Sequence, residues 1–202
     1  MKRRRGKRVL EVLAMSLVSA SVGSCSISRV AREGSPHASP SRRMSDGSWW
    51  MTTNLALGVA GSYCYNDTES NCRQYGRLYT WEAALRACES LGDGWRLPTN
   101  DEWRRMAGHY GGVSDDSETG GRTAFAALSS GGSSGFGALL GGGRSSTDEG
   151  YARLDAHGFY WTASESDSAT AWFYNFGRGG GALHRHDDGD KARAFSVRCV
   201  RD

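Results

Sequence analysis

The spacing of apolar residues predicts a helix in the segment "YTWEAALRACESLGDG" (residues 79–94). Five apolar residues recur there at helical spacing: Trp81, Ala84, Leu85, Cys88 and Leu91. Thr80 stands at the N-cap position before this pattern, and Gly92 stands where a helix would stop. The pattern therefore predicts an amphipathic helix that carries Cys88 on its buried face.

A second, shorter helix is predicted to start within "GWRLPTNDEW" (residues 94–103). Thr99 followed three residues later by Glu102 matches the capping box of a helix start. The two tryptophans of the segment are expected to be core residues, with Trp103 on the buried face of this helix. These local roles leave Arg96 unexplained, and we expect it to form a buried, charge-assisted pair with an acidic residue.

The last fifty residues have the patterns of β-strands. Four segments are the expected strands: "HGFYWTASE" (157–165), "TAWFYNFG" (170–177), "GALHRHD" (181–187) and "ARAFSVRCVRD" (192–202). Gly- and Asp-rich turns separate them, which favours an antiparallel meander, and "DDGD" (187–190) suits a tight hairpin turn. Residues 111–150 are rich in Gly and Ser and are expected to form long loops. The sequence thus predicts an α+β fold, with two short helices early and antiparallel strands and long Gly/Ser-rich loops after them.

Residues 1–24 have the segment order of a bacterial lipoprotein signal peptide. Six Lys or Arg fall within the first eight residues, an apolar stretch follows, and small residues lead to Cys25. The apolar stretch is too short for a membrane-spanning helix. The ending "VGSC" resembles the lipobox, in which the Cys becomes the lipidated N-terminus. An ordinary signal peptide with an incidental Cys25 is the alternative.

This interpretation divides the chain into three parts. A signal peptide spans residues 1–24, the lipidated Cys25 and a polar, flexible tether span residues 25–47, and a folded domain spans residues 48–202. By resemblance to enterobacterial sorting rules, the Ser after Cys25 favours the outer membrane. We therefore expect an exported protein that is lipid-anchored to the bacterial cell envelope, at the outer membrane or cell surface.

The positive charge of the chain lies in the expected signal peptide. The full sequence has 25 Lys and Arg against 22 Asp and Glu, whereas residues 25–202 have 19 against 21. Because the expected domain has no basic excess, charge gives no case for nucleic acid as a partner.

Four cysteines lie in the expected domain: Cys64, Cys72, Cys88 and Cys199. An even number in an exported protein is typical of two disulfides, and the sequence leaves all three pairings open. No two of these cysteines have the short gap, about two to four residues, that structural zinc sites use. This spacing argues against a zinc site.

Candidate ligand-binding residues gather near the C-terminus, around the segment 175–190. Five residues there are the candidates for contacting a ligand: Tyr174, Arg178, His184, His186 and Asp188. His184 and His186 stand two apart on an expected strand, so both project to one face, as polar residues of a solvent-facing hairpin or as a weak metal site with Asp188. An exposed aromatic ring beside them would suit a sugar or a peptide. No Ser, His and acid stand in a nucleophile context, so we expect no catalytic group. We also expect no metal and no cofactor.

The order of motifs resembles the C-type lectin-like fold. A helix with "W-x-x-A-x-x-x-C" is followed by "GWRLPTNDEW", a loop-rich middle, and strands that end in a Cys. In that fold a Cys of the first helix bonds a Cys of the last strand, which implies a Cys88–Cys199 disulfide. Cys64 and Cys72 would then close the small loop "CYNDTESNC".

Five segments together resemble the Fibrobacter succinogenes major paralogous domain, over residues 51–202. They are "CRQYGRLYTWEAALRAC", "GWRLPTNDEW", "GFGALLGG", "GFYWTASE" and "FSVRCVRD". That family occurs in exported bacterial proteins, many of them lipoproteins. Together with the expected signal peptide and tether, the resemblance leads us to expect a binding or adhesion module on the cell surface, with a glycan or a protein as ligand.

The motifs "RLPT-x-x-EW" and "RCVRD" are also similar to formylglycine-generating enzymes, which are copper-dependent cysteine oxidases. Those enzymes use a reactive cysteine pair in the later part of the domain. No Cys lies here between Cys88 and Cys199, so nothing in that region offers the thiolates that hold cuprous copper. We expect a non-catalytic domain. An enzyme of this type and a structural envelope component are the alternatives.

Overall fold

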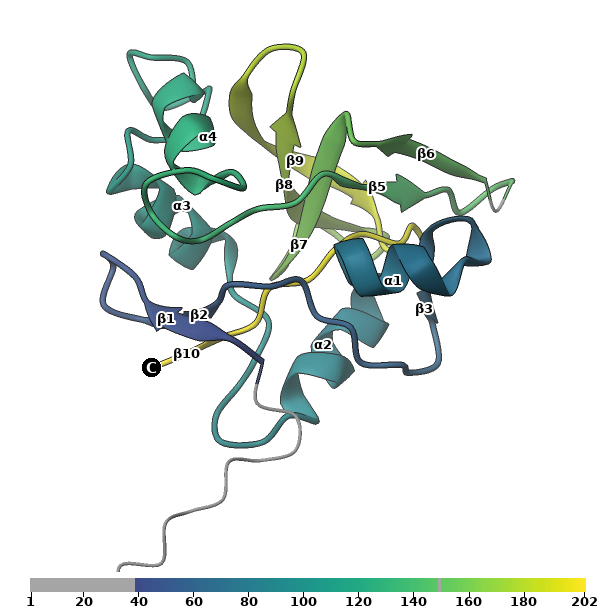
Figure 1. Cartoon of the computed structure of the whole chain (residues 1–202). Coiled ribbons are helices and arrows are strands. Elements are labelled where there is room, and N and C mark those ends of the chain that lie inside the picture. Colours follow the sequence, from purple (N-terminus) through teal and green to yellow (C-terminus); the bar gives the residue numbers. More distant parts are fainter. Residues whose placement is uncertain (1–38, 149) are drawn as a thin grey trace, which may run out of the picture. The chain divides into compact units, whose positions relative to one another are not determined.

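The computed structural model describes residues 39–148 and 150–202 (Figure 1). The expected signal peptide, Cys25 and the first part of the expected tether lie outside the described residues. Among the described helices, none combines the length and the apolar character that crossing a membrane requires.

The described residues form four α-helices, a short 3-10 helix and ten β-strands (Figure 1). The helices are α1 (Glu69–Tyr75), α2 (Trp81–Glu89), α3 (Asn100–Gly108) and α4 (Arg122–Leu128), with the 3-10 helix η1 at Tyr65–Asp67. The early strands are β1 (Ser41–Arg43), β2 (Trp49–Met51), β3 (Ser62–Tyr63) and β4 (Leu78–Tyr79). The later strands are β5 (Gly141–Arg144), β6 (Tyr151–Leu154), β7 (His157–Glu165), β8 (Thr170–Gly177), β9 (Ala182–Asp190) and β10 (Val200–Arg201).

The strands form three sheets, and the α+β class is confirmed. The largest sheet has five strands in the order β6-β5-β7-β8-β9, in which only the β5–β7 pair is parallel. β1, β2 and β10 form a three-stranded antiparallel sheet, and β3 and β4 form a two-stranded one. The long strands β7 and β8 have the bounds that the sequence pattern predicts.

One face of the five-stranded sheet packs against α3. Tyr160, Tyr174 and Phe176 lie on this face and are fully buried. The indole of Trp103 stacks on Tyr174 with ring centroids 4.9 Å apart, and it meets Phe136 edge-on at 5.5 Å. Trp103 is therefore the core residue that the sequence predicts.

The opposite face of the sheet packs against α2. Trp161 of β7 is fully buried there, and its ring centroid lies 4.5 Å from that of Phe195. The indole N–H of Trp81 donates to the carbonyl of Thr162 at 2.8 Å, which joins the first residue of α2 to β7. Both faces of the sheet thus contribute to the core.

α2 and α3 both begin where the sequence predicts, but only α3 has a side-chain cap. Thr99 and Glu102 form the complete capping box of α3, each side chain accepting a hydrogen bond from the backbone of the other. Thr80 occupies the N-cap position of α2, but its side chain makes no capping hydrogen bond.

The long loops expected over residues 111–150 are interrupted by α4 and β5, which the sequence pattern did not indicate. α4 begins after Gly121, whose φ of 77° lies in the left-handed region. The carbonyl of Gly121 accepts a hydrogen bond from Leu183 of β9 at 3.1 Å, so α4 lies beside β9 (Figure 1). This contact is long-range and leaves no local pattern in the sequence. α1 was likewise not predicted.

The predicted hairpin turn at residues 187–190 was also wrong, because β9 continues to Asp190. Register places Asp187 and Asp188 together opposite the single residue Trp172, which is a β-bulge. Gly189 follows the bulge, and a Cβ there would lie 2.7 Å from the rings of both Phe173 and Trp161. The glycine therefore serves close packing under these rings, and the actual β8–β9 turn lies at residues 178–181.

The folded domain begins earlier than residue 48. Residues 41–43, expected to belong to the tether, form β1 and pair with β2. Met44 is buried, and the indole N–H of Trp50 donates to Asp46 at 3.0 Å. These contacts anchor the segment before residue 48 to the core, which the polar composition of the segment does not indicate.

Two disulfides join Cys64 to Cys72 and Cys88 to Cys199. This pairing is the one that the resemblance implied. The first disulfide closes the short segment with η1 and α1, and the second ties α2 to the residue before β10.

The guanidinium of Arg198 is the charged group at the centre of the domain. It is fully buried and donates hydrogen bonds of 2.6–3.0 Å to the carbonyls of Met51, Phe136 and Gly137 and to the side chain of Asn54. Desolvation lowers the pKa of Arg198. No carboxylate among the described residues pairs with it. Neutral oxygens from separate segments stabilise the charge, together with the rings of Phe136 and Tyr160, whose centroids lie 4.6 and 5.9 Å from the guanidinium carbon.

Candidate ligand-binding face

Six side chains share one face of β7, β8 and β9, which we call the aromatic strip: His157, Phe159, Phe173, Asn175, His184 and His186. Phe173 is buried, and the other five are half-buried. Residues two apart on a strand share a face, and the strand register brings these residues into rows. Phe159 lies opposite Asn175, which lies opposite His184, and in the next row Phe173 lies opposite His186.

Ring stacking and hydrogen bonding hold the strip together. His157 stacks on Phe159 with centroids 5.5 Å apart, and its Nδ1 shares a 3.0 Å hydrogen bond with Asn175 Oδ1. His186 stacks on Phe173 at 4.9 Å. The strip therefore offers flat ring faces beside imidazole and amide groups.

A hollow of about 330 Å³ lies beside the strip, and we call it the aromatic hollow. Its aromatic lining residues are Tyr151, Phe159, Phe173 and Phe195, and its cationic ones are Arg144, Arg153 and Arg193. Phe195 stacks on Phe159 with centroids 5.0 Å apart, and Phe173 packs against it at 5.0 Å. A Cβ at Gly143 would lie 3.1 Å from the ring of Phe195, so this glycine makes room for the aromatic floor.

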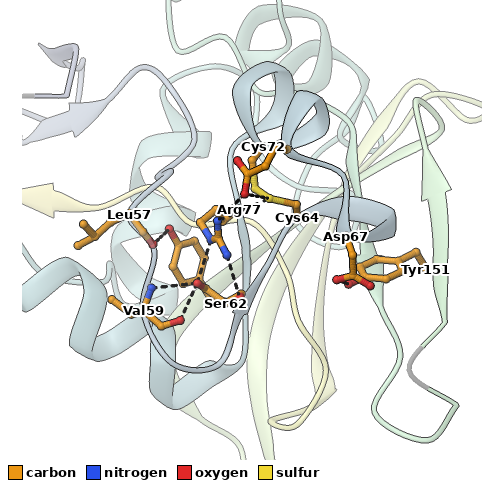
Figure 2. Close-up of polar contacts among 10 residues, drawn as sticks. Leu57, Val59, Ser62, Cys64, Asp67, Cys72, Arg77 and Tyr151 are labelled. Carbon is orange, nitrogen blue, oxygen red and sulfur yellow. Dashed lines mark hydrogen bonds and ion pairs between the residues drawn. A yellow bond between two sulfur atoms is a disulfide. The ribbon is translucent and has the colours of Figure 1, made fainter.

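Tyr151 forms one wall of the hollow and is held by the loop that the Cys64–Cys72 disulfide closes. Its hydroxyl donates to Asp67 Oδ1 at 2.7 Å (Figure 2), and its ring lies 5.2 Å from that of Tyr65. Desolvation, assisted by this hydrogen bond to Asp67, raises the pKa of Tyr151 to about 12. The hydroxyl of Tyr151 therefore stays protonated at neutral pH.

Arg77 braces the disulfide loop from the other side (Figure 2). Its guanidinium donates to the hydroxyl and the carbonyl of Ser62 at 3.0 and 3.2 Å. It also lies 3.5 Å from Cys64 Sγ and 3.9 Å from Glu69 Oε1. Arg77 thus joins β3, β4 and the disulfide loop.

Cys64, Glu69 and Cys72 bring their potential metal-ligand atoms within 4.8 Å of one another. The two sulfur atoms are bonded to each other, so neither is a thiolate that could bind a metal. The cluster is a structural part of the loop.

Two of the five predicted ligand residues, His184 and His186, lie in the aromatic strip. Asp188 is exposed within the β9 bulge, outside the strip. Arg178 is exposed in the β8–β9 turn, where it lines a separate hollow of about 400 Å³ with Asp155. Two of the predicted ligand residues therefore belong to the face that we consider as the candidate site.

Tyr174 was wrongly predicted to contact a ligand. It is fully buried against Trp103, and its hydroxyl donates to the carbonyl of Asn100 at 3.1 Å. Alternation places Tyr174 on the face opposite to Phe173. That face is covered by α3, so neither its ring nor its hydroxyl is open to a ligand.

Phe159 and His157 were not among the predicted ligand residues. Both lie in β7, at alternate positions. The signal was present, because in "HGFYWTASE" the residues 157, 159 and 161 share one face. What the sequence does not show is that α2 covers this face over Trp161 and leaves Phe159 half-buried.

Another hollow, of about 880 Å³, runs along α3 and the loop that follows it. Polar and charged residues make up most of its lining, and two of them, Arg104 and Asp116, form an ion pair at 2.8 Å. It lacks the aromatic rings of the strip, and we place the candidate site at the strip and its hollow.

The fold and the site define a disulfide-bonded α+β domain with an aromatic, cation-lined face. Residues 45–201 match the Fibrobacter succinogenes major domain, and the chain belongs to that family. Comparison with curated proteins and with solved structures returned no match.

Proposed function

We propose that this chain is an exported bacterial lipoprotein whose domain is a non-catalytic binding or adhesion module. The observation that carries the proposal is the aromatic strip, where rings and hydrogen-bonding groups lie half-exposed beside a hollow. Binding sites for small ligands combine apolar ring surface with a few convergent polar groups in this way. A glycan or a protein segment is the ligand class that such a face suits.

The anchoring part of the proposal rests on the N-terminal sequence, with its basic residues, apolar stretch and Cys25. Two disulfides in the domain agree with an oxidising compartment outside the cytoplasm. The membrane is therefore the proposed partner of the lipidated terminus, at the outer membrane or the cell surface. The Cys88–Cys199 bond also agrees with the C-type lectin-like interpretation, a fold used by many binding modules.

The competing proposal is an oxidase of the formylglycine-generating type. All four cysteines of the described residues form disulfides, and none lines the aromatic hollow. An oxidase of that type needs reactive thiols, so this arrangement favours binding over catalysis. Incubation of the full chain with cuprous copper and a cysteine-containing peptide separates the two, because aldehyde formation would support the enzyme. A structural envelope component remains the third candidate, and self-association would favour it.

The binding proposal is tested by screening the full chain on glycan and peptide arrays. Phe159→Ala removes the half-exposed ring of the strip and is expected to abolish binding of the hits. The matched control is Trp49→Ala, since Trp49 is the exposed large apolar residue, 38% accessible, and lies outside the strip. Hits that survive Phe159→Ala, or an array without hits, would contradict the proposal.

The anchoring proposal is tested by replacing Cys25 with Ser in the full chain. We expect the wild-type protein in the membrane fraction, carrying a lipid on Cys25 that mass spectrometry detects. The Cys25→Ser variant is expected to be released from the membrane. Membrane association that is equal in both proteins would refute lipid anchoring through this residue.

A further inference from the structure

The aromatic hollow has a positive rim. Arg144, Arg153 and Arg193 line it, whereas Asp148 is the one acidic side chain among the described residues that do so. An electropositive hollow with an aromatic floor favours a ligand that has both a flat apolar face and a negative charge.

The three arginines differ in the contacts that their guanidinium groups make within the protein. The guanidinium of Arg144 lies over the rings of Tyr63 and Tyr151, at 4.1 and 5.9 Å. Arg153 and Arg193 are exposed, and no hydrogen bond or ion pair within the described residues engages their guanidinium groups. These two guanidinium groups are therefore open to a ligand.

Asp190 is the acid whose pKa is influenced by Arg193, but its carboxylate does not form an ion pair with Arg193. Hydrogen bonds from Ser146 and from the backbone of Ala192 lower the pKa of Asp190, with a smaller contribution from Arg193. Ser146 Oγ lies 2.6 Å from Asp190 Oδ2, so the carboxylate is directed to this hydroxyl. Arg193 retains its donors.

The backbone at Arg153 is strained, with a φ of 70°. A non-glycine residue in this left-handed region costs on the order of 1 kcal/mol or more, and glycine would avoid the cost. The chain has many glycines nearby but places a long cationic side chain at this position. Arg153 is exposed, so packing within the protein does not account for a long side chain at this strained position. A role in the hollow would account for it.

We infer that the aromatic hollow binds an acidic saccharide, a pyranose ring that carries a carboxylate. The inference rests on the proposed binding function and names its ligand class. The ring's C–H face packs on the aromatic lining of the hollow, and its carboxylate pairs with Arg153 and Arg193 in the planar geometry that guanidinium groups favour. Asn175 and His184 of the adjoining strip supply hydrogen-bonding groups for ring hydroxyls.

The size of the hollow favours a saccharide over an acidic peptide. About 330 Å³ lies near the lower limit of pockets for small ligands and suits one or two compact rings. A peptide would present its carboxylate on a flexible side chain, with no flat apolar face for Phe159. An acidic peptide is therefore the alternative outcome of the test.

The test measures binding of three probes to the full chain by isothermal titration calorimetry. The probes are a trimer of galacturonic acid, the same trimer as its methyl ester, and triglutamate. The methyl ester keeps the rings and removes the charge. We expect the free acid to bind at least about tenfold tighter than the ester, with an affinity that falls as salt rises, and triglutamate to bind no better than the ester.

Three variants and one control locate the interaction. Arg193→Gln is expected to reduce the affinity for the free acid about tenfold. In the double variant with Arg153→Gln, the affinity for the free acid is expected to fall to that for the ester. Phe159→Leu is expected to weaken both sugar probes. Arg178→Gln removes an exposed charge outside the hollow and is expected to leave all affinities unchanged.

Equal binding of acid and ester, absence of binding by the acid, or equal effects of Arg193→Gln and Arg178→Gln would each overturn the inference. Tight binding of triglutamate alone would replace the saccharide with an acidic peptide. If the inference fails but binding of a neutral array ligand is lost in Phe159→Ala, the proposed binding function is still supported. If no array ligand binds in a way that depends on Phe159, the proposed binding function fails together with the inference.

Discussion

Arg96 and Glu102 form a bidentate ion pair, in which each guanidinium nitrogen lies 2.7 Å from a carboxylate oxygen. The same carboxylate accepts a hydrogen bond from the backbone N–H of Thr99 at 2.8 Å. The backbone N–H of Arg96 in turn donates to Val200 at 3.0 Å. The acid that closes the capping box therefore also links the start of α3 to the last strand, which gives Arg96 its role.

Glu102→Gln is expected to lower the free energy of unfolding by about 2 kcal/mol, because it removes charge-assisted hydrogen bonds at a buried position. Desolvation raises the pKa of Glu102, but hydrogen bonds from Arg96 and Thr99 outweigh it and hold the pKa below its usual range. The stabilisation is therefore complete above about pH 4.3, the usual carboxyl pKa, and is lost as the pH falls through the lower pKa of the folded state. Urea unfolding at pH 7 and pH 3.5 measures both effects.

Glu82→Gln is the matched control for Glu102→Gln. Glu82 pairs with Arg86 at 3.6 Å on the exposed face of α2, and the pair is worth at most about 0.5 kcal/mol. Equal losses of stability in the two variants would show that the Arg96–Glu102 pair has no special role.

The two disulfides are expected to differ in their contribution to stability. Cys88 and Cys199 are 111 residues apart, and Cys64 and Cys72 are 8 residues apart. On the chain-entropy model the long loop gives about 4–5 kcal/mol and the short one about 2–3 kcal/mol. Paired Cys→Ala variants, compared by urea unfolding, test this order. A larger loss from the 64/72 pair would contradict the entropic account.

Local patterns were sufficient for part of this fold. Alternation predicted the bounds of β7 and β8, and the Thr99–Glu102 spacing predicted the start of α3. Each of these signals arises from residues that lie close together in the sequence. The disulfide pairing needed the family resemblance, because the cysteines alone left three pairings open.

The features of the fold and the candidate site that local patterns did not predict depend on long-range contacts. A sequence pattern treats Arg198 as an ordinary charged residue, yet four oxygens from distant segments converge on it. In the same way, alternation gave the two faces of β8 but not how far the helices cover each face. That is why Tyr174 was placed with the ligand residues and Phe159 was overlooked.

Asp67→Asn is expected to lower the pKa of Tyr151 from about 12 toward its ordinary value near 10. Desolvation is the larger cause of the raised pKa and persists in the variant, so the shift is partial. Since the folded state favours the neutral phenol, Tyr151 stabilises the fold below about pH 10 and loses this contribution as the pH rises toward 12. NMR titration of labelled tyrosine follows the change. An unchanged pKa would show that the hydrogen bond to Asp67 is not formed in solution.

His186 is expected to titrate below the ordinary histidine pKa of about 6.5. Burial against Phe173 is the main cause of the lowered pKa, opposed by Asp188 and assisted by His184. The unfolded chain takes up its proton first, so stability falls as the pH drops below about 6.5. His186→Phe keeps the ring stack and is expected to flatten this decline, whereas His109→Gln, at an exposed histidine outside the strip, is expected to preserve it. NMR titration and urea unfolding between pH 5 and 7 give the two readouts, and a pKa of His186 at or above 6.5 would refute the close packing of this ring.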